Sequence, residues 1–193
     1  MLKPSENPPI TWPEGRSIRE FTGQWWVAHT KSRNEKSLAH DLAAKEVSYF
    51  LPMTWKVRRI RGRTFKSLLP IFGGYLFFCG QEHQRIDVLR TNRVANLIEV
   101  KDQERLVKEL SQIEQALVAG ANLLPHKYIK EGQRCRVIGG PLAELQGIVV
   151  KARNETRLVM QIDMLGQAAS VEIGMDMIEP IDENEVKLNN AGR

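Results

Sequence analysis

Apolar residues recur with two different periods along the chain, and the change falls near residue 120. Before it, β-branched and aromatic residues gather in four short runs, which predict strands at 25–30, 47–51, 75–79 and 97–100. After it, the helical period disappears and only short β runs follow. The sequence therefore predicts two modules of different architecture.

Helices are expected between the strands of the first module. Ser32 stands three residues before Glu35, a capping-box signature, and the apolar stripe of Leu38 and Leu42 follows it. A short helix is expected at 84–90. Asp102 is a suitable cap for a longer helix whose stripe needs a sheet to cover. The order strand-helix-strand-strand-helix-strand is the split βαβ arrangement, so we expect an α+β fold with a four-stranded antiparallel sheet and flanking helices.

The second module reads as five short strands. They are expected at 133–138, 147–151, 157–164, 167–173 and 177–181, with a tight reversal at Leu165-Gly166. Five strands in so short a segment suit a small closed barrel.

Gly120 can end a helix and Pro125 bars its continuation. The expected parts are a polar N-terminal tail 1–22, a first domain 23–119, a linker 120–128, a second domain 129–182 and a C-terminal tail 183–193.

The charge is unevenly placed. The chain carries a formal net charge of +5, and no acidic residue occurs between Glu46 and Glu82. Six cations cluster in that interval, a segment that we call the basic arm: Lys56, Arg58, Arg59, Arg61, Arg63 and Lys66. A charge run of this kind is usually a solvated loop. Without compensating acids it is also a candidate phosphate-contacting surface, because each neutralised phosphate releases counterions.

Signatures of catalysis and of metal binding are missing. No Walker loop, dinucleotide fingerprint, zinc-protease helix, Cys-x-x-Cys pair or nucleophile elbow occurs, and the four histidines have no ligand spacing. Cys79 and Cys135 lie in apolar runs and are expected to be buried, inert thiols. No apolar run reaches the roughly 20 residues of a membrane-spanning helix. We expect a cytoplasmic protein that is not an enzyme, holds no cofactor and is a monomer.

Two stretches carry a resemblance. Residues 132–151, with Gly139-Gly140-Pro141 and Gly147, resemble a KOW motif, which implies that the second module is an SH3-like KOW barrel. Residues 25–30, 69–78 and 93–98 resemble the NGN domain that precedes KOW in the NusG family of transcription elongation factors. Together the two resemblances cover about residues 24–181.

The resemblance to NusG implies a way of working. The NGN domain of that family binds the clamp helices of RNA polymerase and suppresses pausing, and the family takes part in termination and antitermination. Carried onto this chain, the polymerase contact uses Phe72 and Tyr75, supported by Trp25 and Leu97. The basic arm stands where specialised members read the exposed non-template DNA strand. Gly73 departs from the proline that the family usually has before the second glycine.

The resemblance to KOW implies a second partner. The family barrel docks the ribosomal NusE protein or the Rho terminator through the loop after Gly-Pro and through the Leu-Gly turn. Those positions are Leu142, Leu145, Leu165 and Gln167 here. The family usually has an aromatic residue in place of Leu142 and a basic one in place of Gln167. At these two positions this chain departs from the residues with which the family binds either partner.

Two alternatives remain open from the sequence. The chain can be a general elongation factor or an operon-directed relative of it. It can also be a ribosome-associated RNA-binding protein, because KOW barrels occur in ribosomal proteins. A net charge of −1 over residues 121–193 and the aromatic strand entrance at Phe72 and Tyr75 count against the ribosomal hypothesis.

Overall fold

The computed structural model describes residues 6–60, 62–129, 132–152 and 155–181. The chain divides into two compact units, residues 1–114 and 115–193. The division falls within one helix, α3 (Gln103–Val118), a few residues before the expected boundary at 119.

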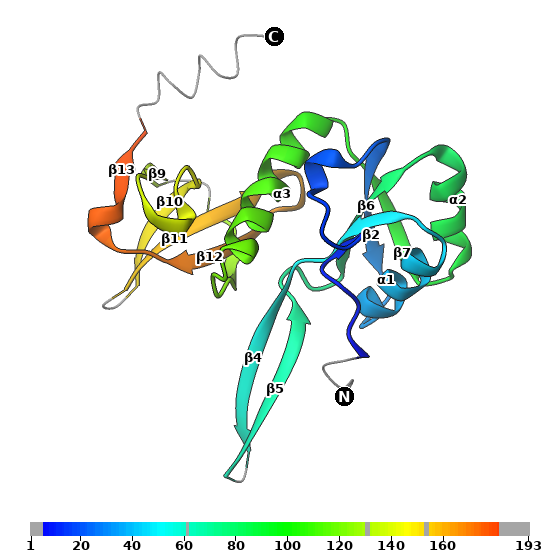
Figure 1. Cartoon of the computed structure of the whole chain (residues 1–193), viewed down its shortest axis with the longest axis horizontal. Helices are drawn as coiled ribbons and strands as arrows, with labels where there is room; N and C mark the ends of the chain where they lie inside the picture. Colours follow the sequence, from blue (N-terminus) through cyan, green and yellow to red (C-terminus); the bar gives the residue numbers. More distant parts are fainter. Residues whose placement is uncertain (1–5, 61, 130–131, 153–154, 182–193) are drawn as a thin grey trace. The chain divides into compact units, whose positions relative to one another are not determined.

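The N-terminal unit contains a five-stranded antiparallel sheet in the order β1-β3-β6-β2-β7 (Figure 1). Four of these strands are the expected ones, and the connections β2-α1-β3 and β6-α2-β7 give the split βαβ topology. The strands and helices are β1 (Thr11–Trp12), β2 (Gln24–Thr30), α1 (Glu35–Ala44), β3 (Ser48–Phe50), β6 (Tyr75–Gly80), α2 (Glu82–Arg90) and β7 (Val94–Glu99).

Both faces of the neighbouring strands β2 and β6 carry buried residues. Trp26, Leu76 and Phe78 join the apolar stripe of α1 in one core. Their neighbours along the strands, Val27 and Phe77, point to the opposite face and are fully buried. Figure 1 shows α1 and α2 on one side of the sheet and α3 on the other. In α3 the buried residues Leu106, Leu110 and Ile113 form the expected stripe, and Asp102 caps the helix through the Arg105 amide at 3.0 Å.

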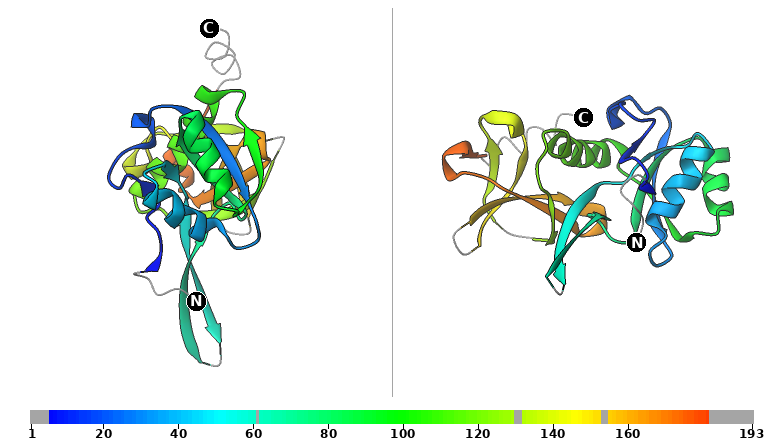
Figure 2. Two further views of the ribbon diagram at one scale, coloured as in Figure 1. Left: turned by 90° about the vertical axis from the view of Figure 1, so that its right-hand side faces the viewer. Right: turned by 60° about the horizontal axis from the view of Figure 1, so that its bottom comes forward.

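The basic arm is a β-hairpin, which the sequence analysis did not predict. Strand β4 (Met53–Ile60) pairs with β5 (Arg63–Pro70) in a separate two-stranded sheet. Along the chain the hairpin is inserted between β3 and β6. It projects from the N-terminal unit, and its two strands twist about each other (Figure 2). Its base is fixed, since Met53 is buried in the core beside α1 and Leu68 packs against the same core.

The expected polar tail is wrong for the part of it that the structure describes. β1 adds a strand to the edge of β3, and Ser17 begins a short 3₁₀ helix (Ile18–Glu20). Ile18 is 1% exposed, and its amide donates to Glu114 of α3 at 2.9 Å. Residues 6–21 thus belong to the folded domain. Residues 1–5 and the expected C-terminal tail at 183–193 lie outside the described residues.

The C-terminal unit contains a six-stranded antiparallel sheet in the order β13-β9-β10-β11-β12-β8. Five strands match the expected runs, and the sixth, β8, lies inside the segment expected to be a linker. Among the described residues the pairing is open, with β13 and β8 at the two edges, so barrel closure is not part of the observed pairing. The strands are β8 (Leu124–Lys127), β9 (Arg134–Val137), β10 (Gln146–Ala152), β11 (Glu155–Ile162), β12 (Gln167–Glu172) and β13 (Ile178–Pro180).

The packing of Ile18 generates a stability prediction. Replacing Ile18 with Ala removes a buried side chain and should lower the free energy of unfolding by roughly 2–4 kcal/mol, measured by urea denaturation. The control is Arg16→Ala, because Arg16 and its partner Glu20 are mostly exposed and 3.8 Å apart. That variant should stay within about 0.5 kcal/mol of the wild type. Equal unfolding midpoints for both variants would show that the N-terminal segment is a tail after all.

Candidate functional site

Tyr75 stands at the start of the central strand β6, where a tight turn leads into the sheet. The Tyr75 amide donates to the Phe72 carbonyl at 3.1 Å, which closes a four-residue turn. Gly74, the third residue of that turn, has φ +84°, as a type II turn requires. The sequence Phe72-Gly73-Gly74-Tyr75 therefore sets the entrance of the strand by its turn chemistry.

The turn is held from two sides. The Gly74 amide donates to a carboxylate oxygen of Glu35 at 2.7 Å, and the Thr30 amide donates to the Gly74 carbonyl at 2.8 Å. Glu35 is the residue expected to complete a capping box with Ser32. That expectation is wrong, because α1 begins at Glu35 itself, Asn34 is its N-cap, and the carboxylate serves the Gly74 turn instead.

The Tyr75 ring is half-buried and stacks on the exposed ring of His29. The ring centroids are 5.1 Å apart with an interplanar angle of 27°. His29 and Tyr75 are directly opposite in the pairing of β2 with β6, which is the spacing at which aromatic pairs meet across strands. We call His29, Glu35, Gly74 and Tyr75 the Tyr75 site.

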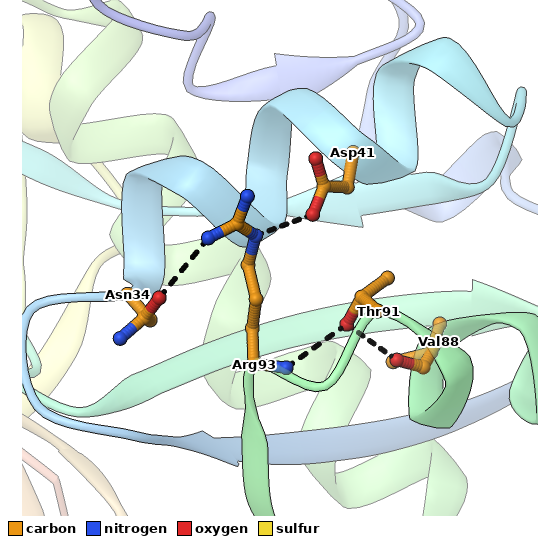
Figure 3. Close-up of polar contacts among 5 residues, drawn as sticks. All are labelled: Asn34, Asp41, Val88, Thr91 and Arg93. Atoms are coloured by element: carbon orange, nitrogen blue, oxygen red, sulfur yellow. Dashed lines mark hydrogen bonds and ion pairs between the residues drawn. The ribbon is translucent and has the colours of Figure 1, made fainter.

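A polar network fixes the loops at the same end of the sheet (Figure 3). Arg93, just before β7, forms an ion pair with Asp41 of α1 and donates to the side-chain oxygen of Asn34 at 3.2 Å. Its own amide donates to the Thr91 hydroxyl oxygen, and that hydroxyl donates to the Val88 carbonyl at 2.7 Å. The loop before β7 is therefore held against α1 by these polar contacts.

The structure does not bring the four expected polymerase-contacting residues to one exposed surface. Phe72 is 1% exposed and sits edge-on to Phe77, with ring centroids 6.1 Å apart. Trp25 is 3% exposed and stacks on Phe21 at 5.7 Å. The expectation that the Phe72 ring is exposed is wrong, because the turn at Gly74 directs it into the domain. Tyr75 alone of the three aromatic rings is accessible.

Leu97 lies apart from the other three. It pairs with Ala28 in the register of β2 with β7, whereas Tyr75 pairs with His29. Consecutive residues of a strand point to opposite faces, so Leu97 faces α1 and packs against the core there. Leu97 therefore does not share the face of the sheet on which Tyr75 lies.

The basic arm keeps its described cations in solvent. Lys56, Arg58, Arg59, Arg63 and Lys66 are all exposed, and among the described residues none of the five forms an ion pair. Arg61 lies outside the described residues. Sequence reasoning missed the apolar members of the arm: Trp55, Val57 and Phe65 are 47%, 58% and 41% exposed. The sequence signal that could have identified them is their position among the cations of the acid-free interval.

The four expected partner-binding residues of the second unit divide into two kinds. Leu142, Leu165 and Gln167 are half-buried, but Leu145 is fully buried and belongs to the core, which corrects its expected exposure. Two exposed apolar side chains stand beside these positions instead. Ile138 precedes the Gly139-Gly140 loop with 54% exposure, and Met164 precedes Leu165 with 41%.

Side chains that could bind a metal ion do not gather in the described part of the chain. No cluster of three or more His, Cys, Asp or Glu side chains there could hold a metal ion. Cys79 and Cys135 are free and buried, and burial raises the pKa of the Cys79 thiol to about 11 and that of Cys135 above its ordinary value. The described helices include none that is both long and apolar enough to span a membrane.

Comparison with known families decides the identity of the first unit. Residues 23–117 match the family model NusG, described as transcription termination factor nusG. The chain belongs to the NusG family through this domain. As a NusG-family protein it is a factor of transcription elongation, and the family consists of non-enzymatic factors. The matched residues include β2 to β7, the arm hairpin and most of α3.

A search of solved structures also gives a match. The crystal structure of an MjSpt4:Spt5 complex in conformation B is 12% identical in sequence, with a TM-score of 0.26. The alignment covers 82% of this NusG-family chain and 97% of the other chain. A search of curated proteins returns no match.

The Gly73-Gly74 turn gives a matched pair of variants. Gly74→Ala should lower the free energy of unfolding by about 1–2 kcal/mol, because an L side chain is strained at φ +84° and its Cβ would meet His29 at 3.4 Å. Gly73→Ala should be neutral or slightly stabilising, since a Cβ there meets nothing within 4 Å. Urea denaturation of both variants tests this, and an equal loss in both would contradict the turn.

Proposed function

We propose that this NusG-family chain binds the clamp helices of RNA polymerase through the Tyr75 site and modulates pausing, termination and antitermination. The observation that carries the proposal is the half-buried Tyr75 ring, which is accessible at the end of strand β6, whereas Phe77 and Phe78 of the same strand are buried. A rigid aromatic side chain that is held in place before binding is the typical anchor of a protein interface.

The other residues of the site support binding because they hold Tyr75 in one position. Phe72 lies beneath the turn, and Glu35 and Thr30 hold Gly74, so Tyr75 loses little conformational freedom when a partner covers it. His29 extends the aromatic surface on one side. A partner helix with an apolar stripe fits such a surface, since helix recognition uses a few anchors at helical spacing.

The basic arm contributes a second contact in this proposal. Five exposed cations without acidic neighbours favour a polyanion, and a transcribing polymerase presents nucleic acid close to any factor bound on it. The exposed non-template DNA strand is the proposed ligand.

The C-terminal unit provides the third contact. We propose that it is a KOW domain that recruits NusE or Rho through Leu142, Leu165 and Gln167. Ile138 and Met164 add exposed apolar area next to these residues.

Tyr75→Ala should weaken binding to core RNA polymerase by about 30-fold, the effect of removing an interface anchor worth roughly 2 kcal/mol. Tyr75→Phe should bind within about three-fold of the wild type, since the ring is kept. Leu89→Ala is the control, because Leu89 is 43% exposed on α2. Affinity is measured by surface capture of the polymerase, with circular dichroism to confirm folding. Unchanged affinity of folded Tyr75→Ala would refute the assignment, and binding to ribosomal RNA alone would favour the ribosomal alternative.

The arm is tested by its salt dependence. Replacing Arg58, Arg59 and Arg63 with Glu should flatten the slope of log Kd against log salt by about two or more for binding to a polymerase complex with open DNA. The control replaces the exposed Lys45, Lys101 and Lys108 with Glu, which changes the net charge equally. Equal slopes in the two triple variants would show that the arm is a solvated hairpin without a nucleic-acid role.

A further inference from the structure

The basic arm is attached to the N-terminal unit only through its base. Residues 55–59 and 62–66 of the hairpin are all exposed, whereas Met53 and Thr54 at the start of β4 are buried. Figure 1 shows the two strands extending away from the sheet, with only one end of the hairpin beside it. The contacts at the base therefore set the direction of the arm.

A small rotation at the base moves the far end of the arm a long way. Each strand has 8 residues and spans about 27 Å at roughly 3.4 Å per residue. A rotation of about 20° would shift the far end by roughly 9 Å. Successive phosphates of one DNA strand are about 3.4 Å apart along the axis, so such a rotation changes which nucleotides the arm can reach.

Apolar and backbone contacts hold the ends of the two strands. The Ile71 amide donates to the Pro52 carbonyl at 2.9 Å, just outside the hairpin. Met53 and Leu68 pack against the core that α1 covers. These contacts keep the base of the arm on the domain.

Lys36 of α1 adds a polar contact to the backbone of β5. Its Nζ donates to the Leu68 carbonyl, two residues before the end of the strand at Pro70. The same Nζ donates to Oδ1 of Asn7 at 2.5 Å. Burial lowers the pKa of Lys36, and the charge of the adjacent Glu35 opposes that shift. Lys36 is thus a half-buried ammonium group that joins α1 to the arm and to the N-terminal segment.

The N-terminal segment holds the acceptor Asn7 in place. The hydroxyl of the buried Tyr49 donates to the Pro9 carbonyl at 3.1 Å, and the Leu51 amide donates to the Ile10 carbonyl at 2.7 Å. This segment precedes residue 23, where the match to the NusG family model begins. The contact of Asn7 with the ammonium group therefore lies outside the part of the chain that matches the family.

The residue before Lys36 holds the Tyr75 site. Glu35 accepts from the Gly74 amide at 2.7 Å, and both Glu35 and Lys36 belong to the first turn of α1. One helix end therefore contacts the turn that presents Tyr75 and also the strand that forms one side of the arm. The two proposed contact sites share a single rigid support.

We propose that Lys36 is a positioning residue, which fixes the direction of the basic arm relative to the Tyr75 turn. It acts through the Leu68 carbonyl and contacts neither polymerase nor nucleic acid itself. The inference deepens the proposed function and rests on the proposed contact of the arm. Two linked contacts strengthen each other only when the geometry allows both at once, so the direction of the arm decides how much its contact adds.

The direction of the arm is measured in the free, full chain. Thr64→Cys on the arm and Glu99→Cys on β7 provide exposed sites for two spin labels, and pulsed electron paramagnetic resonance gives the distribution of distances between them. The native Cys79 and Cys135 are buried, which disfavours their labelling.

Three variants are compared in this measurement. Lys36→Met removes the ammonium group but keeps an apolar stem, and it should widen the distance distribution by several ångströms. Asn7→Ala should widen it less, because the contact with the Leu68 carbonyl is kept. Lys45→Met is the matched control, since Lys45 is exposed just after α1, and it should give the distribution of the wild type. Circular dichroism confirms that all three are folded.

Binding to polymerase gives the second readout. Lys36→Met should bind a polymerase complex with open DNA about 3- to 10-fold more weakly than the wild type, because fewer directions of the arm allow both contacts. Its affinity for core polymerase without nucleic acid should stay within about two-fold, since Glu35 still holds the Tyr75 turn. Lys45→Met removes the same charge and should leave both affinities unchanged.

The outcomes separate this inference from the proposed function. An unchanged distance distribution in Lys36→Met and Asn7→Ala would overturn the inference, whatever the polymerase measurements give. A wider distribution with full affinity for the open-DNA complex would also overturn it, provided that glutamate variants of the arm arginines lose affinity there. If those arginine variants also bind like the wild type, the proposed nucleic-acid contact of the arm fails, whereas a wider distribution would still support Lys36 as the residue that fixes its direction.

Discussion

Burial of the central strand β6 on both faces is the constraint that shapes the N-terminal unit. Leu76 and Phe78 pack toward α1, and Phe77 and Cys79 pack toward the other side, all with at most 1% exposure. A strand of this kind can offer side chains to a partner only at its ends. The Gly74 turn makes one end available, which is why Tyr75 is accessible although its neighbours along β6 are not.

Much of the fold could be predicted, because the residues that fix it show a clear period. Four of the five sheet strands of the first unit, and α3, followed from apolar runs and stripes. The arm hairpin was missed because cations stand on both of its faces, so no face is uniformly apolar and no alternation marks β4 or β5. Strand β8 was missed because Pro125 resembles a helix stop, yet a proline is tolerated in an edge strand, and β8 is one.

The strand entrance at Gly74 and Tyr75 was predicted from the sequence, but which of its aromatic rings is accessible was not. The motif Phe72-Gly73-Gly74-Tyr75 correctly indicated a strand entrance, because glycine is needed at φ +84°. Which of the two rings faces solvent depends on the turn and on what covers each face, and residue type alone does not specify it. Leu97 was misplaced for a similar reason, since its side is set by the pairing of β7 with β2, and a shift of one residue reverses the face.

The order of elements along the chain places the two proposed contacts, that of Tyr75 and that of the arm, next to each other. The arm leaves the sheet after β3 and returns just before the Tyr75 turn, and the Ile71 amide donates to the Pro52 carbonyl at 2.9 Å across its base. Met53 at the base is buried in the core. A partner that covers Tyr75 is therefore bound close to the fixed base of the arm. In such an arrangement a weak contact of the arm with a nucleic-acid strand gains from the high local concentration that the first contact provides.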